Sequence, residues 1–95
     1  ALLTATMALP APPVGGKDSD YDSNDAAGRY QGLDMTCTLN FVSQCPAVSV
    51  PSGFTVGGLP TGLQIVGRRY DEATVLRVAA TLEAIQPWAG LRPPV

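Results

Sequence analysis

The chain has 95 residues, of which 45% are hydrophobic and only 15% are charged, and its formal net charge is −2. This length allows one domain at most, and the charged fraction is well below the share of about 25% in typical soluble domains, which indicates that much of the surface faces protein. A direct nucleic-acid ligand is not expected because the few basic residues form no stripe that could neutralise a phosphate backbone; they are Lys17, Arg29, Arg68, Arg69, Arg77 and Arg92.

The first segment, "ALLTATMALPAPP", predicts a short strand over Ala1–Leu9 and a proline-rich loop after it. Prolines cannot donate to a β-ladder, so the strand should stop before them. The apolar core also resembles that of a signal peptide, but the basic start is missing, so a buried strand is favoured. No apolar run approaches the ~20 residues that a membrane-spanning helix needs.

Residues 15–34 have the composition of a solvated loop, rich in glycine and acidic residues. Asp18, Asp20, Asp22 and Asn24 alternate like the first ligands of an EF-hand calcium loop. That pattern then fails, because Ser23 replaces the turn glycine and Arg29 replaces the bidentate glutamate. A calcium site is therefore not expected.

The region from Met35 onward predicts the regular structure. A short helix is expected over Met35–Gln44, and two strands over Pro46–Val50 and Thr61–Gly67, whose apolar residues occupy both faces. A longer helix is expected over Asp71–Gln86, capped by Asp71 and ended by Pro87. Its apolar stripe consists of Val75, Val78, Ala79, Leu82 and Ile85. These elements predict an α/β fold with about three strands, and one helix alone cannot cover both faces of the sheet.

Few residues could carry chemistry. The absence of His excludes a Ser/His/Asp triad, and Lys17, the only lysine, lies in the polar loop, where it should stay solvated and protonated. Ser49 and Ser52 are interpreted as a strand hydroxyl and a turn residue. The run "GGLPTG" lacks the Lys and helix of a phosphate-binding loop.

The two cysteines, Cys37 and Cys45, match no zinc pattern, since they lie eight positions apart without His. We expect them to be buried, reduced thiols of a cytoplasmic protein. No catalytic, cofactor-binding or metal-binding residue is therefore predicted within this chain, and no cofactor.

The runs "PAVSVPSGF", "GLPTGLQIVG" and the acidic helix start "DE" occur in this order between Asn40 and Glu83. They resemble the C-terminal region of the amidase signature family, which reads G-x-PA-x-S-x-P-x-GF, then GLP-x-GLQ-x-x-G, then an acidic helix start. The first segment also resembles a strand and loop of that family, although Ala5 stands where proline is usual and Gln44 where glycine is more frequent. The matching positions are Asn40, Pro46, Ala47, Ser49, Pro51, Gly53, Phe54, Gly58, Leu59, Pro60, Gly62, Leu63, Gln64, Gly67, Asp71, Glu72, Leu76, Ala79, Leu82 and Glu83.

This resemblance implies the C-terminal part of an α/β/α sandwich with a mixed sheet. Residues 1–95 would form that part: 1–14 as strand and loop, 15–34 as polar loop, and 35–95 as sheet end and final helix. The family hydrolyses or transfers amides with a serine nucleophile, a second serine in a cis peptide and a lysine, all at positions before the matched region. The chain alone is therefore expected to be inactive, with the missing N-terminal part of the enzyme as its partner and a small-molecule amide as the substrate of the complete enzyme. Its isolated form is expected to self-associate.

Two alternatives remain open from the sequence. The chain could be the same portion of a glutamine-dependent aminoacyl-tRNA amidotransferase subunit, or a small binding module without an enzymatic parent.

Overall fold

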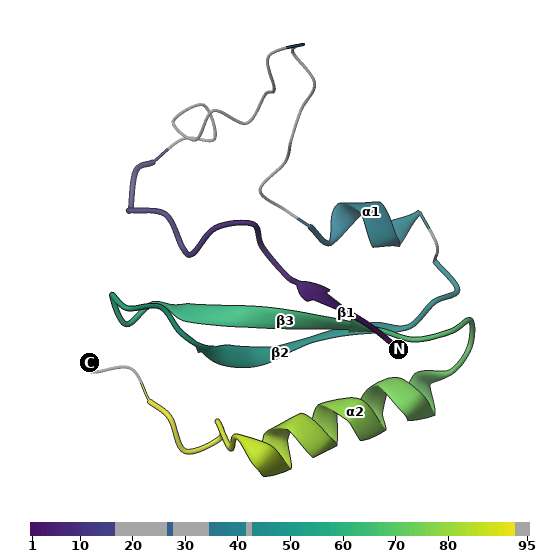
Figure 1. The fold of residues 1–95 in the computed structure, drawn as a ribbon. Helices are drawn as coiled ribbons and strands as arrows, with labels where there is room; N and C mark the ends of the chain where they lie inside the picture. Colours follow the sequence, from purple (N-terminus) through teal and green to yellow (C-terminus); the bar gives the residue numbers. More distant parts are fainter. Residues whose placement is uncertain (17–26, 28–34, 42, 93–95) are drawn as a thin grey trace.

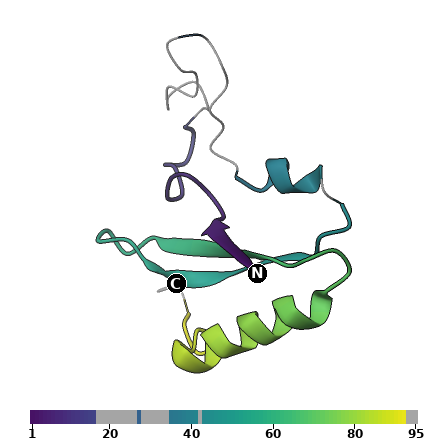
Figure 2. The same cartoon turned by 45° about the vertical axis from the view of Figure 1, so that its right-hand side comes forward.

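The computed structural model describes residues 1–16, 27, 35–41 and 43–92. Within these residues the chain forms three strands and two helices, with a helix on each side of the sheet (Figures 1 and 2). The elements in chain order are β1 (Leu2–Ala5), α1 (Cys37–Asn40), β2 (Ala47–Phe54), β3 (Pro60–Val66) and α2 (Glu72–Ile85). This arrangement agrees with the predicted α/β class of about three strands, one long helix and one short helix.

The sheet has the order β1-β3-β2, and both pairings are antiparallel. The central strand β3 aligns Gln64 with Thr4 on one side and with Ser49 on the other. Since side chains alternate across a strand, this polar row lies on the face opposite to the one that carries Leu63 and Ile65. The parallel pairings of a mixed sheet stay an expectation for the larger fold.

The core lies between the sheet and α2. Val50, Ile65 and Val75 are buried there, which fits the predicted helix stripe. The side chains packed around them are Val48, Leu63, Val78, Ala79, Leu82 and Trp88. Ile85, the last member of the predicted stripe, is 74% exposed because it occupies the final residue of α2, beyond the sheet-facing turns.

The ends of α2 follow the predicted signals. The Asp71 carboxylate accepts a hydrogen bond from the Thr74 backbone N–H at 3.2 Å, which satisfies one donor that the first turn leaves unpaired. At the other end the Gln86 N–H donates to the Leu82 carbonyl at 2.9 Å, and Pro87 cannot continue the helix.

Three predicted boundaries were wrong. The first strand ends at Ala5 rather than Leu9, and the short helix is a single turn, Cys37–Asn40. Strand β2 continues past Pro51 to Phe54. Pro51 is tolerated because β2 is an edge strand, and a register shift between Pro51 and Gly53 forms a bulge in which Gly53 takes a φ of 134°.

Among the residues that the model describes, no helix is both long and apolar enough to cross a membrane.

Candidate functional site

The sheet face opposite α2 carries hydroxyl groups that tie the three strands together. The hydroxyls of Thr6 and Ser49 lie 2.7 Å apart, within hydrogen-bond distance, although 43 positions separate them in the chain. They meet directly above β3, where Gly62 has no side chain. A Cβ at Gly62 would lie 2.9 Å from the Thr6 Oγ1 and 3.2 Å from the Ser49 Oγ, so a glycine is needed for this bond to form.

Gln64 lies at the centre of the same face and is 3% exposed. Its side-chain Nε2 is buried and has no hydrogen-bond partner. The neighbouring hydroxyls on either side have partners of their own, since Thr4 donates to the Ala5 carbonyl at 3.1 Å and Ser49 bonds to Thr6. A buried amide group without a partner is uncommon and unfavourable.

A groove of about 500 Å³ lies beside Gln64 and separates the α1 region from the sheet. We call it the α1 groove. Its wall combines apolar and small polar side chains, and none of the described residues that line it carries a charge. The principal lining residues are Leu39, Ser43, Cys45, Ala47, Ser49 and Gln64.

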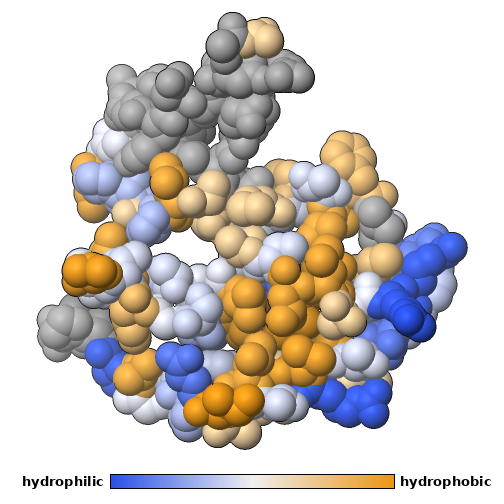
Figure 3. Space-filling model, in the orientation of Figure 1, coloured by the Kyte–Doolittle hydropathy of each residue, from blue (hydrophilic) through white to orange (hydrophobic). Residues whose placement is uncertain are grey.

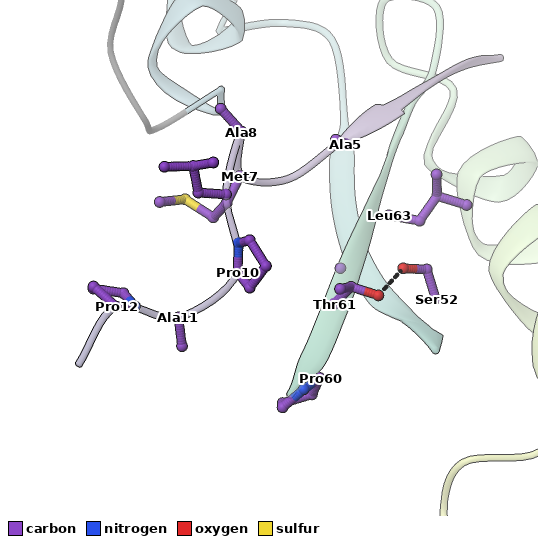
Figure 4. A pocket seen from close by; sticks show the side chains of 12 residues that line it. Ala5, Met7, Ala8, Pro10, Ala11, Pro12, Ser52, Pro60, Thr61 and Leu63 are labelled. Atoms are coloured by element: carbon purple, nitrogen blue, oxygen red, sulfur yellow. Dashed lines mark hydrogen bonds between the residues drawn. The ribbon is translucent and has the colours of Figure 1, made fainter. Parts of the chain in front are cut away.

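A second pocket, of about 490 Å³, lies between the proline-rich segment after β1 and the far end of β3. Figure 4 shows Met7, Pro10 and Pro12 on one side and Thr61 on the other. The hydroxyls of Ser52 and Thr61 bond at 2.9 Å, and Thr61 also donates to the Gly53 carbonyl at 3.2 Å. Ser52 is the additional residue of the β2 bulge, which accounts for its position against Thr61.

Neither serine that the sequence singled out is paired with a base. Ser49 lies on β2 with the Thr6 hydroxyl as its partner, and Ser52 lies on β2 with the Thr61 hydroxyl. A neutral hydroxyl cannot act as a general base near neutral pH. Ser52 is therefore a strand residue at a bulge rather than the turn residue that the sequence predicted.

Other residues considered in the sequence fall in different places. Lys17 and the alternating acidic run 18–24 lie outside the described residues. Cys37 is exposed, so the prediction that it is buried was wrong, because α1 is one turn long and does not press it against the sheet; Cys45 is partly buried. Within residues 1–16, 27, 35–41 and 43–92, no group of three or more His, Cys, Asp or Glu could hold a metal ion.

Gln64, Thr6 and Thr61 were not anticipated as a set from the sequence. The signal for Gln64 was its position, since it is the one polar long side chain between Leu63 and Ile65 in a strand of otherwise apolar or small residues. The pairing of Thr6 with Ser49 depends on the β1-β3-β2 order, which the local sequence does not encode.

Comparison with known proteins gives the family. The family model described as amidase matches residues 1–76, which is most of the chain. The chain belongs to the amidase family. This confirms the resemblance drawn from the sequence motifs.

The curated relatives of this amidase-family chain include both hydrolases and glutamyl-tRNA(Gln) amidotransferase subunits. An acylamidase of Rhodococcus erythropolis is 54% identical over 69 residues, which cover 72% of this chain and 14% of that protein. The glutamyl-tRNA(Gln) amidotransferase subunit of Methanosarcina acetivorans is 43% identical over 93 residues, covering 98% of this chain and 18% of that protein. The corresponding protein of Acidobacterium capsulatum is 43% identical over 86 residues, covering 90% of this chain and 17% of that protein.

This amidase-family chain thus spans less than a fifth of the length of these relatives. No solved structure matches it.

Proposed function

We propose that this chain forms the sheet end and covering helix of an amide hydrolase whose catalytic groups lie in other parts of the same enzyme. The observation that carries this proposal is the pairing of both serine hydroxyls with threonine hydroxyls, which leaves each without a base. The match to the amidase family and the small share of each relative that is covered support it.

The proline-lined pocket is the part of the chain that we assign to a wall of the substrate site. Its lining is mainly apolar, and the Ser52 and Thr61 hydroxyls add a small polar element. Substrate pockets commonly combine an apolar wall with a few placed polar groups that orient the ligand. In this role the chain shapes the site and does not supply the nucleophile.

The test is a segment exchange. This chain replaces the matching segment of the Rhodococcus erythropolis acylamidase, and hydrolysis of a chromogenic anilide is measured for the chimera, for the same host with the segment deleted, and for this chain alone. We expect activity in the chimera only, and we expect Ser49→Ala in the chimera to retain it. A chimera that folds but has no activity, or a loss of more than a hundredfold with Ser49→Ala, would contradict the proposal.

A second candidate function is the corresponding portion of an amidotransferase subunit. The observation that favours it is coverage, because the Methanosarcina acetivorans protein matches 98% of this chain whereas the acylamidase matches 72%. The same exchange into the Methanosarcina acetivorans protein separates the two candidates: glutamine-dependent activity would be restored by this chain in the amidotransferase chimera and not in the acylamidase chimera.

A further inference from the structure

The buried Gln64 amide points to a contact that this chain makes with another polypeptide segment. We infer that the α1 groove receives a backbone carbonyl from a segment of the same enzyme that lies outside this chain, and that the Gln64 Nε2 donates a hydrogen bond to it. This inference rests on the proposed function and adds to it the face, the residue and the chemistry of the contact.

The first step is the unpartnered donor. Gln64 is 3% exposed and its Nε2 is buried, so solvent cannot satisfy the amide. Within the chain, the nearest hydroxyls in the polar row are already bonded, Thr4 to the Ala5 carbonyl and Ser49 to Thr6. An acceptor from outside would remove a penalty that the chain otherwise retains.

The second step is the shape and charge of the site. The α1 groove has a volume of about 500 Å³, enough for several backbone atoms, and it is open beside Ala47, which is itself exposed. The described lining is uncharged. A carboxylate would be buried there without a compensating charge, whereas a neutral peptide carbonyl needs only the one donor that Gln64 offers.

The third step identifies the occupant. The curated relatives are far longer than this chain, which spans 14% of the acylamidase and 18% of the Methanosarcina acetivorans protein. In proteins of that length a sheet of this kind has further polypeptide beside it, and strands with apolar residues on both faces are normally covered on two sides. Helix α2 covers one face. The segment in the α1 groove would cover the other.

The experiment measures assembly between this chain and the acylamidase that lacks its matching segment. The chain carries a fluorophore at its N-terminus, and its dissociation constant is obtained by anisotropy titration. The variant Gln64→Met keeps the approximate length of the side chain and removes the donor. The matched control is Gln44→Met, because Gln44 is exposed and takes part in a hydrogen bond only through its backbone carbonyl.

We expect Gln64→Met to assemble about tenfold more weakly, which corresponds to about 1.4 kcal/mol. Thermal melting of the isolated chain should be unchanged or higher, because the donor has no partner there. Gln44→Met should change neither quantity. A second variant, Ala47→Leu, obstructs the groove from an exposed position and should weaken assembly at least tenfold without altering the melting of the chain.

Each other outcome overturns the inference in a recognisable way. If the unmodified chain assembles and both groove variants assemble equally well, the inference fails while the proposed function stands. If the unmodified chain does not assemble, the proposed function fails and this inference with it. If Gln64→Met instead abolishes self-association of the chain alone, the occupant is a second copy and the inference is wrong.

Discussion

The tightest packing in the chain lies where α2 begins, and it gives a sharp test of the fold. Val75 is 3% exposed, and a Cβ added to Gly67 would lie 2.6 Å from the Val75 Cγ2. Such a Cβ would also lie 3.1 Å from the Asp71 carbonyl and from the Pro46 Cγ. The small size of Gly67 and the volume of Val75 are therefore complementary.

The magnitudes follow from this geometry. Val75→Ala removes two buried methyl groups, worth about 0.8 kcal/mol each, and leaves a small cavity, so we expect a loss of roughly 1.5 to 3 kcal/mol. Gly67→Ala overpacks the same site and should cost roughly 1 to 3 kcal/mol. In the double variant the new methyl occupies space that Val75 vacates, so the total should be smaller than the sum by about 1 kcal/mol or more.

Urea unfolding followed by tryptophan fluorescence provides the measurement. Trp88 is the only tryptophan in the sequence, and it packs against the core that Val75 belongs to. Leu76→Ala is the control on the same helix, because Leu76 is 62% exposed and should change stability by about 0.5 kcal/mol or less. Equal effects of Val75→Ala and Leu76→Ala, or strict additivity of the double variant, would refute this account of the packing.

Three further predictions follow. The isolated chain should not hydrolyse a chromogenic anilide faster than buffer; turnover that persists through repurification and disappears with Ser49→Ala would contradict this. The isolated chain should bind a hydrophobic dye and associate in sedimentation experiments, because large apolar side chains such as Leu2 and Leu3 are more than half exposed; a compact monomer that binds no dye would contradict it. Hydrogen bonding by Thr74 holds the pKa of Asp71 below its ordinary value of 3.8, so the cap stabilises α2 above that pH and is lost as the pH falls through the lowered pKa. Circular dichroism between pH 5 and pH 2 should show this loss of helix, and Asp71→Asn should remove the cap's share of the pH dependence.

The sequence was sufficient for β3 and α2 because their signals are local. An apolar run bounded by Pro60 and Gly67 identifies the strand, and a capping residue followed by a 3.6-residue apolar period identifies the helix. The Asp71 cap occurs at the predicted residue. The helix face was also correct at Val75, since burial against a sheet selects the same stripe that the sequence period defines.

The errors arose where distant parts of the chain decide the outcome. Pro51 ends a strand only when its missing donor is needed, and whether β2 is central or at an edge depends on the order of all the strands. Gln64 has the same limitation. Its burial and its lack of a partner depend on β1 and β2 lying on either side of β3, and no pattern within "TGLQIVG" specifies that.

The two faces of the sheet make different demands on whatever covers them. Helix α2 contacts β2 and β3 but not β1. Leu3, which pairs with Ile65 and so shares its helix-facing side, stays 51% exposed. In the orientation of Figure 1, hydrophobic side chains gather in a patch between β1 and α2 (Figure 3). Any apolar surface, including a second copy of the chain, can cover that patch. The opposite face needs an acceptor at one position, beside Gln64, and non-directional association cannot supply it. Self-association of the isolated chain would therefore satisfy the first demand and leave the second unmet.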